Sequence, residues 1–144
     1  MQLPAAQPTE DRVRESSSAA LNRERDEEIA ERVAHYAKQP KARITQRIEE
    51  LEREWDVERA LEVNASSLAL LGVLLGTTVH RRWLVLTGVV AGFLLQHGLQ
   101  GWCPPLPILR RLGLRTQGEI DAEKAALKAL RGDFDSLRSV PQRA

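Results

Sequence analysis

The sequence has few cysteines and few aromatic residues, and its central third is almost free of charge. The single cysteine, Cys103, excludes an intramolecular disulfide framework and any zinc site built from several cysteines. A net charge of +1 provides no strongly basic surface, so no nucleic-acid partner is predicted. No hydrolytic triad, phosphate-binding glycine loop or paired-carboxylate site is evident either. We therefore predict a protein that is not an enzyme and that holds no cofactor and no metal, because His97 and Cys103 alone are too few ligands for a metal.

The central stretch, residues 63–109, carries only two charged side chains, Arg81 and Arg82. It divides into residues 63–79 and residues 83–102, which as helices would measure about 25 Å and about 30 Å. The second length matches the hydrocarbon core of a bilayer, and a helix satisfies its own backbone groups there. The three residues between them suffice for a tight turn. The pattern predicts a helical hairpin that crosses the membrane twice, with the lipid bilayer as its first partner.

The alternative is a buried hairpin in a soluble helical bundle. Polar residues interrupt both segments, namely Asn64, Ser66, Ser67, Gln96, His97 and Gln100. The flanking arms are, however, too charged and too short to cover two apolar helices. Trp83 and Trp102 also bracket the second segment, as interface anchors do in membrane proteins, although each could equally be a packing anchor.

The distribution of arginines predicts the orientation of the hairpin. On the side of the termini, the residues near the spans are Arg47, Arg53, Arg59, Arg110, Arg111 and Arg115, against Arg81 and Arg82 in the turn. The positive-inside rule then places both termini in the cytoplasm of a bacterial cell, with the chain as a multi-pass protein of the inner membrane. No cleavable signal peptide is evident at the N-terminus, so we expect the first span to direct insertion.

The arms complete an all-α fold in which amphipathic cytoplasmic helices flank the hairpin on both sides. Residues 1–21 are expected to form a disordered arm that could be helical near its end, and residues 22–62 an amphipathic helical region. The first helix of that region, residues 22–38, ends before Pro40. Its apolar positions are Ile29, Val33 and Tyr36.

The second helix of the region, residues 42–62, carries a narrow apolar stripe. The stripe consists of Ile44, Ile48, Leu51 and Trp55, at spacings of four, three and four. We favour packing of this stripe on a neighbouring helix or on the membrane surface over a coiled-coil dimer. The helix is expected to continue into the first span or to bend near Asn64.

The hairpin region is expected to span residues 63–115 and to end in the proline-rich segment 103–107, which stops the second span. A C-terminal helix and a loose tail follow over residues 116–144. Thr116 and Glu119 have the spacing of a capping box at the start of this helix, and Gly132 marks its end.

Two pairs of glycines lie at four-residue spacing, Gly72 with Gly76 and Gly88 with Gly92. Such motifs let helix backbones approach closely in lipid, although glycine is also simply frequent in membrane helices. They could close the hairpin on itself or pair two hairpins. We therefore hypothesise a homo-oligomer with these four residues at helix contacts.

Cys103 is the one residue with latent covalent chemistry. A lone cysteine is usually inert packing. At the membrane edge it could also be acylated, or carry a persulfide or a mixed disulfide. Arg110 and Arg111 would lower the pKa of the Cys103 thiol if the prolines fold the chain back.

At Asn64, Gly101, Cys103, Pro104, Leu112 and Gly113, the sequence resembles the YgaP-like inner-membrane transmembrane domain. The resemblance covers roughly residues 55–115 and implies a small two-helix bacterial module. Members occur alone or joined to a rhodanese domain, which handles sulfane sulfur. This chain lacks a rhodanese domain and its active-site cysteine loop, so the resemblance does not carry over sulfur transferase activity.

The expected function is thus that of a non-enzymatic membrane scaffold or oligomerisation module, linked to a soluble sulfur-handling protein as its partner. One alternative is a thiol or persulfide relay, or an export component, that uses Cys103. Another is a soluble helical interaction bundle.

Overall fold

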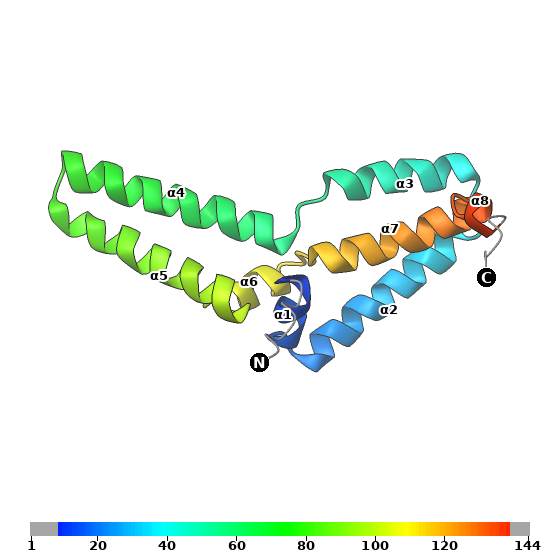
Figure 1. Cartoon of the computed structure of the whole chain (residues 1–144), viewed down its shortest axis with the longest axis horizontal. Helices are drawn as coiled ribbons and strands as arrows, with labels where there is room; N and C mark the ends of the chain where they lie inside the picture. The colour runs from blue at the N-terminus through cyan, green and yellow to red at the C-terminus, as the bar shows by residue number, and fades with distance from the viewer. Residues whose placement is uncertain (1–8, 139–144) are drawn as a thin grey trace, which may run out of the picture. The chain divides into compact units, whose positions relative to one another are not determined.

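The computed structural model describes residues 9–138. In chain order its helices are α1 (Thr9–Glu15), α2 (Ala19–Tyr36), α3 (Lys41–Arg53), α4 (Val57–Thr78), the 3-10 turn η1 (Arg81–Trp83), α5 (Leu84–Gln100), α6 (Leu106–Arg111), α7 (Gln117–Arg131) and α8 (Asp135–Arg138) (Figure 1). Within residues 9–138 there is no β-strand, only an isolated bridge between Asp56 and Arg115. The predicted all-α class is confirmed.

The chain forms two compact units, and each is assembled from segments that are far apart in the sequence. Among the described residues, the first unit contains 9–18 and 55–117, and the second contains 19–54 and 118–138. The first unit therefore holds α1, α4, α5 and α6, and the second holds α2, α3, α7 and α8.

The hairpin of α4 and α5 dominates the first unit (Figure 1). Asp56 caps α4 by accepting a hydrogen bond from the Arg59 backbone N–H, and α5 ends at Gly101, whose φ of 70° is left-handed. α4, and η1 together with α5 (Arg81–Gln100), are long and apolar enough to cross a membrane. Only 22% and 6% of their apolar windows are buried. Helices that expose so much apolar surface suit lipid, whereas the core helix of a soluble protein would be covered.

The core of the first unit lies where the termini of the hairpin meet α1 and α6. It consists of Val13, Val57, Leu61, Cys103 and Leu106, all buried. Leu109 and Leu114 pack against this cluster. The proline-rich segment therefore folds back onto the start of α4.

The second unit is a bundle of α2, α3 and α7. One face of α3 contributes Ile44, Ile48 and Leu51, which form an apolar cluster with Ile120 and Leu127 of α7. Tyr36 at the end of α2 packs against this cluster. The stripe expected on residues 42–62 thus packs on a neighbouring helix of the same chain.

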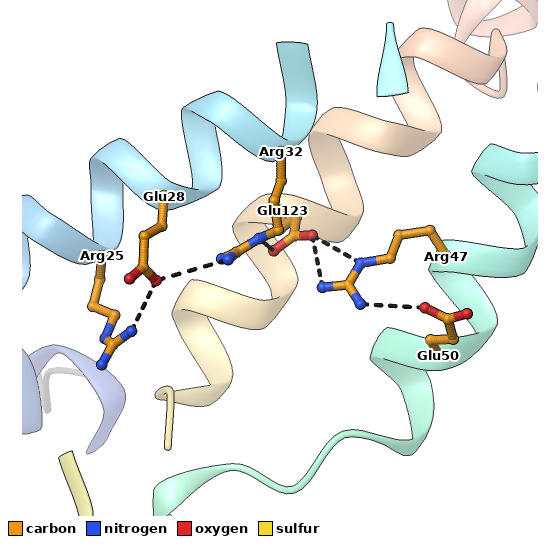
Figure 2. A network of polar contacts seen from close by, with 6 residues as sticks. All are labelled: Arg25, Glu28, Arg32, Arg47, Glu50 and Glu123. Atoms are coloured by element: carbon orange, nitrogen blue, oxygen red, sulfur yellow. Dashed lines mark hydrogen bonds and ion pairs between the residues drawn. The ribbon is translucent and has the colours of Figure 1, made fainter. Parts of the chain in front are cut away.

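The same bundle contains a chain of ion pairs around a buried carboxylate (Figure 2). Glu123 of α7 is fully buried and accepts hydrogen bonds from Arg32 Nε at 3.1 Å and Arg47 Nη2 at 3.1 Å. These arginines belong to α2 and α3, so one carboxylate joins three helices. Arg32 also pairs with Glu28 at 3.7 Å, and Arg47 with Glu50 at 3.3 Å.

The expectation of one helix over residues 42–62 is wrong. Glu54 adopts an extended conformation (φ −66°, ψ 138°), α3 ends at Arg53, and Asp56 restarts the helix as α4. Trp55 therefore leaves the apolar stripe and is 47% exposed, with the Arg59 guanidinium 4.7 Å from its ring centre. The N-cap at Asp56 explains the break, which needs neither proline nor glycine.

The terminal regions also differ from expectation. Where a disordered arm was expected over residues 1–21, α1 and the start of α2 are helical, and residues 1–8 lie outside the described range. At the other end, α7 begins directly after Thr116 and stops before Gly132 (φ 95°), as the sequence predicts. α8 occupies part of the expected loose tail, of which residues 139–144 are not described.

Candidate functional site

The first glycine motif, Gly72 with Gly76, lies where α4 packs against η1 and α5 inside the hairpin. A Cβ atom added to Gly72 would lie 3.1 Å from the Trp83 carbonyl oxygen, and one on Gly76 would lie 2.6 Å from Leu84 Cδ2. Beside Gly72, the Thr87 hydroxyl donates a hydrogen bond to the Ala69 carbonyl at 3.0 Å, which joins α5 to α4. Because Gly72 and Gly76 have no side chains, α4 and α5 can pack closely against each other.

The second glycine motif lies on a different, open face. A Cβ atom on Gly88 or Gly92 would meet nothing within 4 Å. Val85, Leu95 and Leu99 share this side of α5, because together with the glycines they repeat at spacings of three and four. These three side chains are 67%, 65% and 70% exposed. The result is an apolar face with a flat, small-residue centre, which we call the α5 outer face (Val85, Gly88, Gly92, Leu95 and Leu99).

Cys103 is buried in the core of the first unit and is 1% exposed. Burial raises the pKa of its thiol, and a hydrogen bond with the Leu106 backbone opposes this effect more weakly. The lowering of the Cys103 pKa by Arg110 and Arg111, expected if the prolines fold the chain back, is not found, because burial is the largest effect and raises this pKa. The thiol is therefore protonated at neutral pH, which disfavours nucleophilic attack.

An apolar cavity of about 380 Å³ adjoins Cys103 between α4 and α5. Its α4 wall includes Leu61, Ala65 and Leu68, and its α5 wall includes Val89 and Phe93. Such a cavity offers space for hydrocarbon and few polar partners for a reaction.

The two tryptophans flank α5, with Trp83 directly before it and Trp102 two residues after its end. They are 44% and 38% exposed. The assignment of both as membrane-interface anchors stays a prediction.

A groove with mostly apolar walls and a few polar side chains lies beside the start of α4 and the end of α5, and we call it the acidic groove. Glu58, Glu62 and Ser66 line it from α4, and His97 and Gly98 from α5. The groove encloses about 680 Å³. His97 is only 7% exposed, yet its Nδ1 atom has no hydrogen-bond partner among the described residues.

Sequence reasoning identified His97 but not the carboxylates beside it. The i, i+4 spacing of Glu58, Glu62 and Ser66 was the available signal, because it places them on one face of α4. Gln96 and Gln100, named together with His97, are not among the groove residues. Within residues 9–138, no group of three or more His, Cys, Asp or Glu side chains could hold a metal ion.

The part of the chain that contains the hairpin and the proline-rich segment also matches a known family. Residues 56–119 match the family model described as "Inner membrane protein YgaP-like, transmembrane domain". This range contains both candidate spans, the proline-rich segment and both glycine motifs. No curated protein and no solved structure matches the chain.

Proposed function

We propose, from the match of residues 56–119 to the YgaP-like inner-membrane transmembrane domain, that this small membrane protein is a non-enzymatic scaffold that associates with copies of itself. In this proposal the hairpin is the assembly element, and the bundle of α2, α3 and α7 is the part available to a soluble partner. A sulfur-handling protein is the partner class suggested by the rhodanese domains that accompany this module in other members.

The main support for the proposal is that one glycine motif is packed against a helix and the other is open. Gly72 and Gly76 accommodate α5 inside the hairpin, whereas Gly88 and Gly92 accommodate nothing in this chain. Association in lipid depends on close packing rather than on apolar burial, and small residues permit it. The α5 outer face therefore offers the contact for a second hairpin.

Crosslinking of single-cysteine variants tests this contact. In a Cys103→Ser background, we expect Leu95→Cys to give disulfide-linked dimers in mild detergent, because the position lies on the α5 outer face. Adding Gly88→Leu should reduce the dimer yield at least about tenfold, equivalent to about 1.4 kcal/mol of association energy. Ser67→Leu is the matched control, because it adds bulk at an exposed position of α4. Equal dimer yields in the Gly88 and Ser67 variants would contradict the proposal.

The proposed orientation places both arms in the cytoplasm, supported by the arginines near the span ends. The second unit supports the weaker statement that both arms share one side, because α2 and α3 precede the hairpin and α7 follows it. Protease protection of intact cells and of inverted vesicles tests the sidedness. Cleavage of both arms from the outside would overturn it.

The thiol relay is the second candidate, and the cavity beside Cys103 is the observation that favours it. The burial and raised pKa of Cys103 count against it. A relay requires that Cys103→Ser abolish persulfide transfer, whereas a scaffold with this variant keeps its dimer.

A further inference from the structure

We propose that the acidic groove binds the primary-ammonium head group of a zwitterionic phospholipid. Its lining residues are Glu58, Glu62, Val63, Ser66, Leu94, His97 and Gly98. This inference goes beyond the scaffold function and does not depend on association between copies. It requires only the hairpin and a bilayer.

The groove is built to accept hydrogen bonds from a cation. It brings together the carboxylates of Glu58 and Glu62, which as ions have acceptor atoms only. His97 adds a ring nitrogen that is buried and has no partner among residues 9–138. A buried polar atom without a partner is costly, and a ligand that donates to it removes that cost. A primary ammonium carries three N–H donors and a positive charge, which matches these acceptors.

The negatively charged phosphate of a zwitterionic head group also finds a partner of opposite charge beside the groove. Arg12 of α1 donates a hydrogen bond from Nη1 to the Gly98 carbonyl at 3.1 Å, which holds its guanidinium at the edge of the groove. Arginine pairs well with phosphate, so a phosphate beside Arg12 and an ammonium beside Glu62 satisfy both charges.

The position of the groove favours a lipid as the source of the ammonium group. It lies at the ends of both candidate spans, where head groups meet a membrane protein. Val63 and Leu94 continue its wall with exposed apolar side chains, along which acyl chains can pack. A quaternary choline head group lacks N–H donors, and an anionic head group would be repelled by the two carboxylates. Phosphatidylethanolamine chemistry is therefore the best match.

Native mass spectrometry of the full chain in lipid-doped micelles tests the proposal. We expect phosphatidylethanolamine to be retained about tenfold better than phosphatidylcholine at equal mole fraction, as one charge-assisted hydrogen bond would provide. Retention should fall stepwise through the mono- and dimethylated lipids, because each methyl group removes a donor. Glu62→Gln and His97→Phe should abolish the preference. Glu49→Gln, an equal charge change on an exposed position of α3, should preserve it.

Three results would overturn the proposal. The first is equal retention of the two lipids by the unmodified chain. The second is displacement of the bound lipid by free ethanolamine at low millimolar concentration, which would assign the groove to soluble amines. The third is binding of Zn²⁺ that depends on His97 and Glu62. The Ser66→Leu variant fills the groove without changing its charge. It should lose the lipid preference and keep its helicity, which would show that the site is lost while the fold is intact.

Discussion

Replacement of Glu123 by glutamine is the sharpest test of how the bundle of α2, α3 and α7 is held together. The Glu123 side chain is 0% exposed, whereas those of Arg32 and Arg47 are 32% and 19% exposed. In the Glu123→Gln variant the side chain keeps nearly its volume, so little cavity forms. The amide has no charge and carries an NH2 donor in place of one carboxylate oxygen, so one of the two guanidinium groups loses its acceptor.

The expected loss of folding free energy follows from the difference in burial between Glu123 and its two arginines. Breaking a buried ion pair by removing one partner costs about 3–5 kcal/mol. Both arginines can turn toward water, so we expect the low end, about 3 kcal/mol. For a unit of this size that loss lowers the melting temperature by roughly 12–24 °C. The matched control is Glu50→Gln, which removes a partner of Arg47 that is 50% exposed, and it should cost less than about 1 kcal/mol.

Hydrogen exchange with peptide resolution locates the effect, and circular dichroism in mild detergent measures the melting temperature. In the Glu123→Gln variant, protection should fall in α2, α3 and α7 together and should persist in α4 and α5. Equal melting temperatures for the Glu123 and Glu50 variants would refute the reasoning. A triple variant, Arg32→Met with Arg47→Leu and Glu123→Leu, should recover most of the loss, because apolar residues of similar volume can replace a buried ion network.

The hairpin and Cys103 lead to two further predictions. Gly72→Leu should open the hairpin, because a side chain there collides with Thr87 and the backbone of Trp83, and protection of α4 and α5 in hydrogen exchange should drop. Gly88→Leu is its control and should leave that protection unchanged. Cys103 should react with maleimide at neutral pH at least about a hundredfold more slowly in the folded chain than after denaturation, because it is buried and its pKa is raised. The raised pKa means that the thiolate, and hence fast labelling, appears only at a pH above the ordinary range of cysteine. Rapid labelling at neutral pH would show that the thiol is open to a reaction partner.

Elements fixed by local chemistry could be predicted from the sequence. The two spans follow from the length of the uncharged stretch, and the limits of α7 follow from Thr116 before it and Gly132 after it. The α3 face of Ile44, Ile48 and Leu51 could be predicted as a packing surface from its period alone.

Features that depend on distant partners could not be predicted. Glu123 lies among charged residues on α7 and reads as solvated, yet it is buried because Arg32 and Arg47, 91 and 76 residues earlier, reach it. The break after α3 was missed for a different reason. Asp56 is a common N-cap residue, but nothing nearby in the sequence indicates that α4 starts there rather than continuing α3.

The discontinuous second unit has a consequence for biosynthesis. α2 and α3 leave the ribosome before the hairpin. The residues that complete their bundle, Ile120, Glu123 and Leu127, are made only after the whole hairpin. The apolar face of α3 therefore waits uncovered while α4 and α5 enter the membrane, and a nascent chain that stalls before α7 keeps this face open. The bundle can therefore close only after α7, and with it the whole hairpin, has been synthesised. A product truncated before α7 carries an uncovered α3 face, the kind of surface that chaperones and proteases recognise.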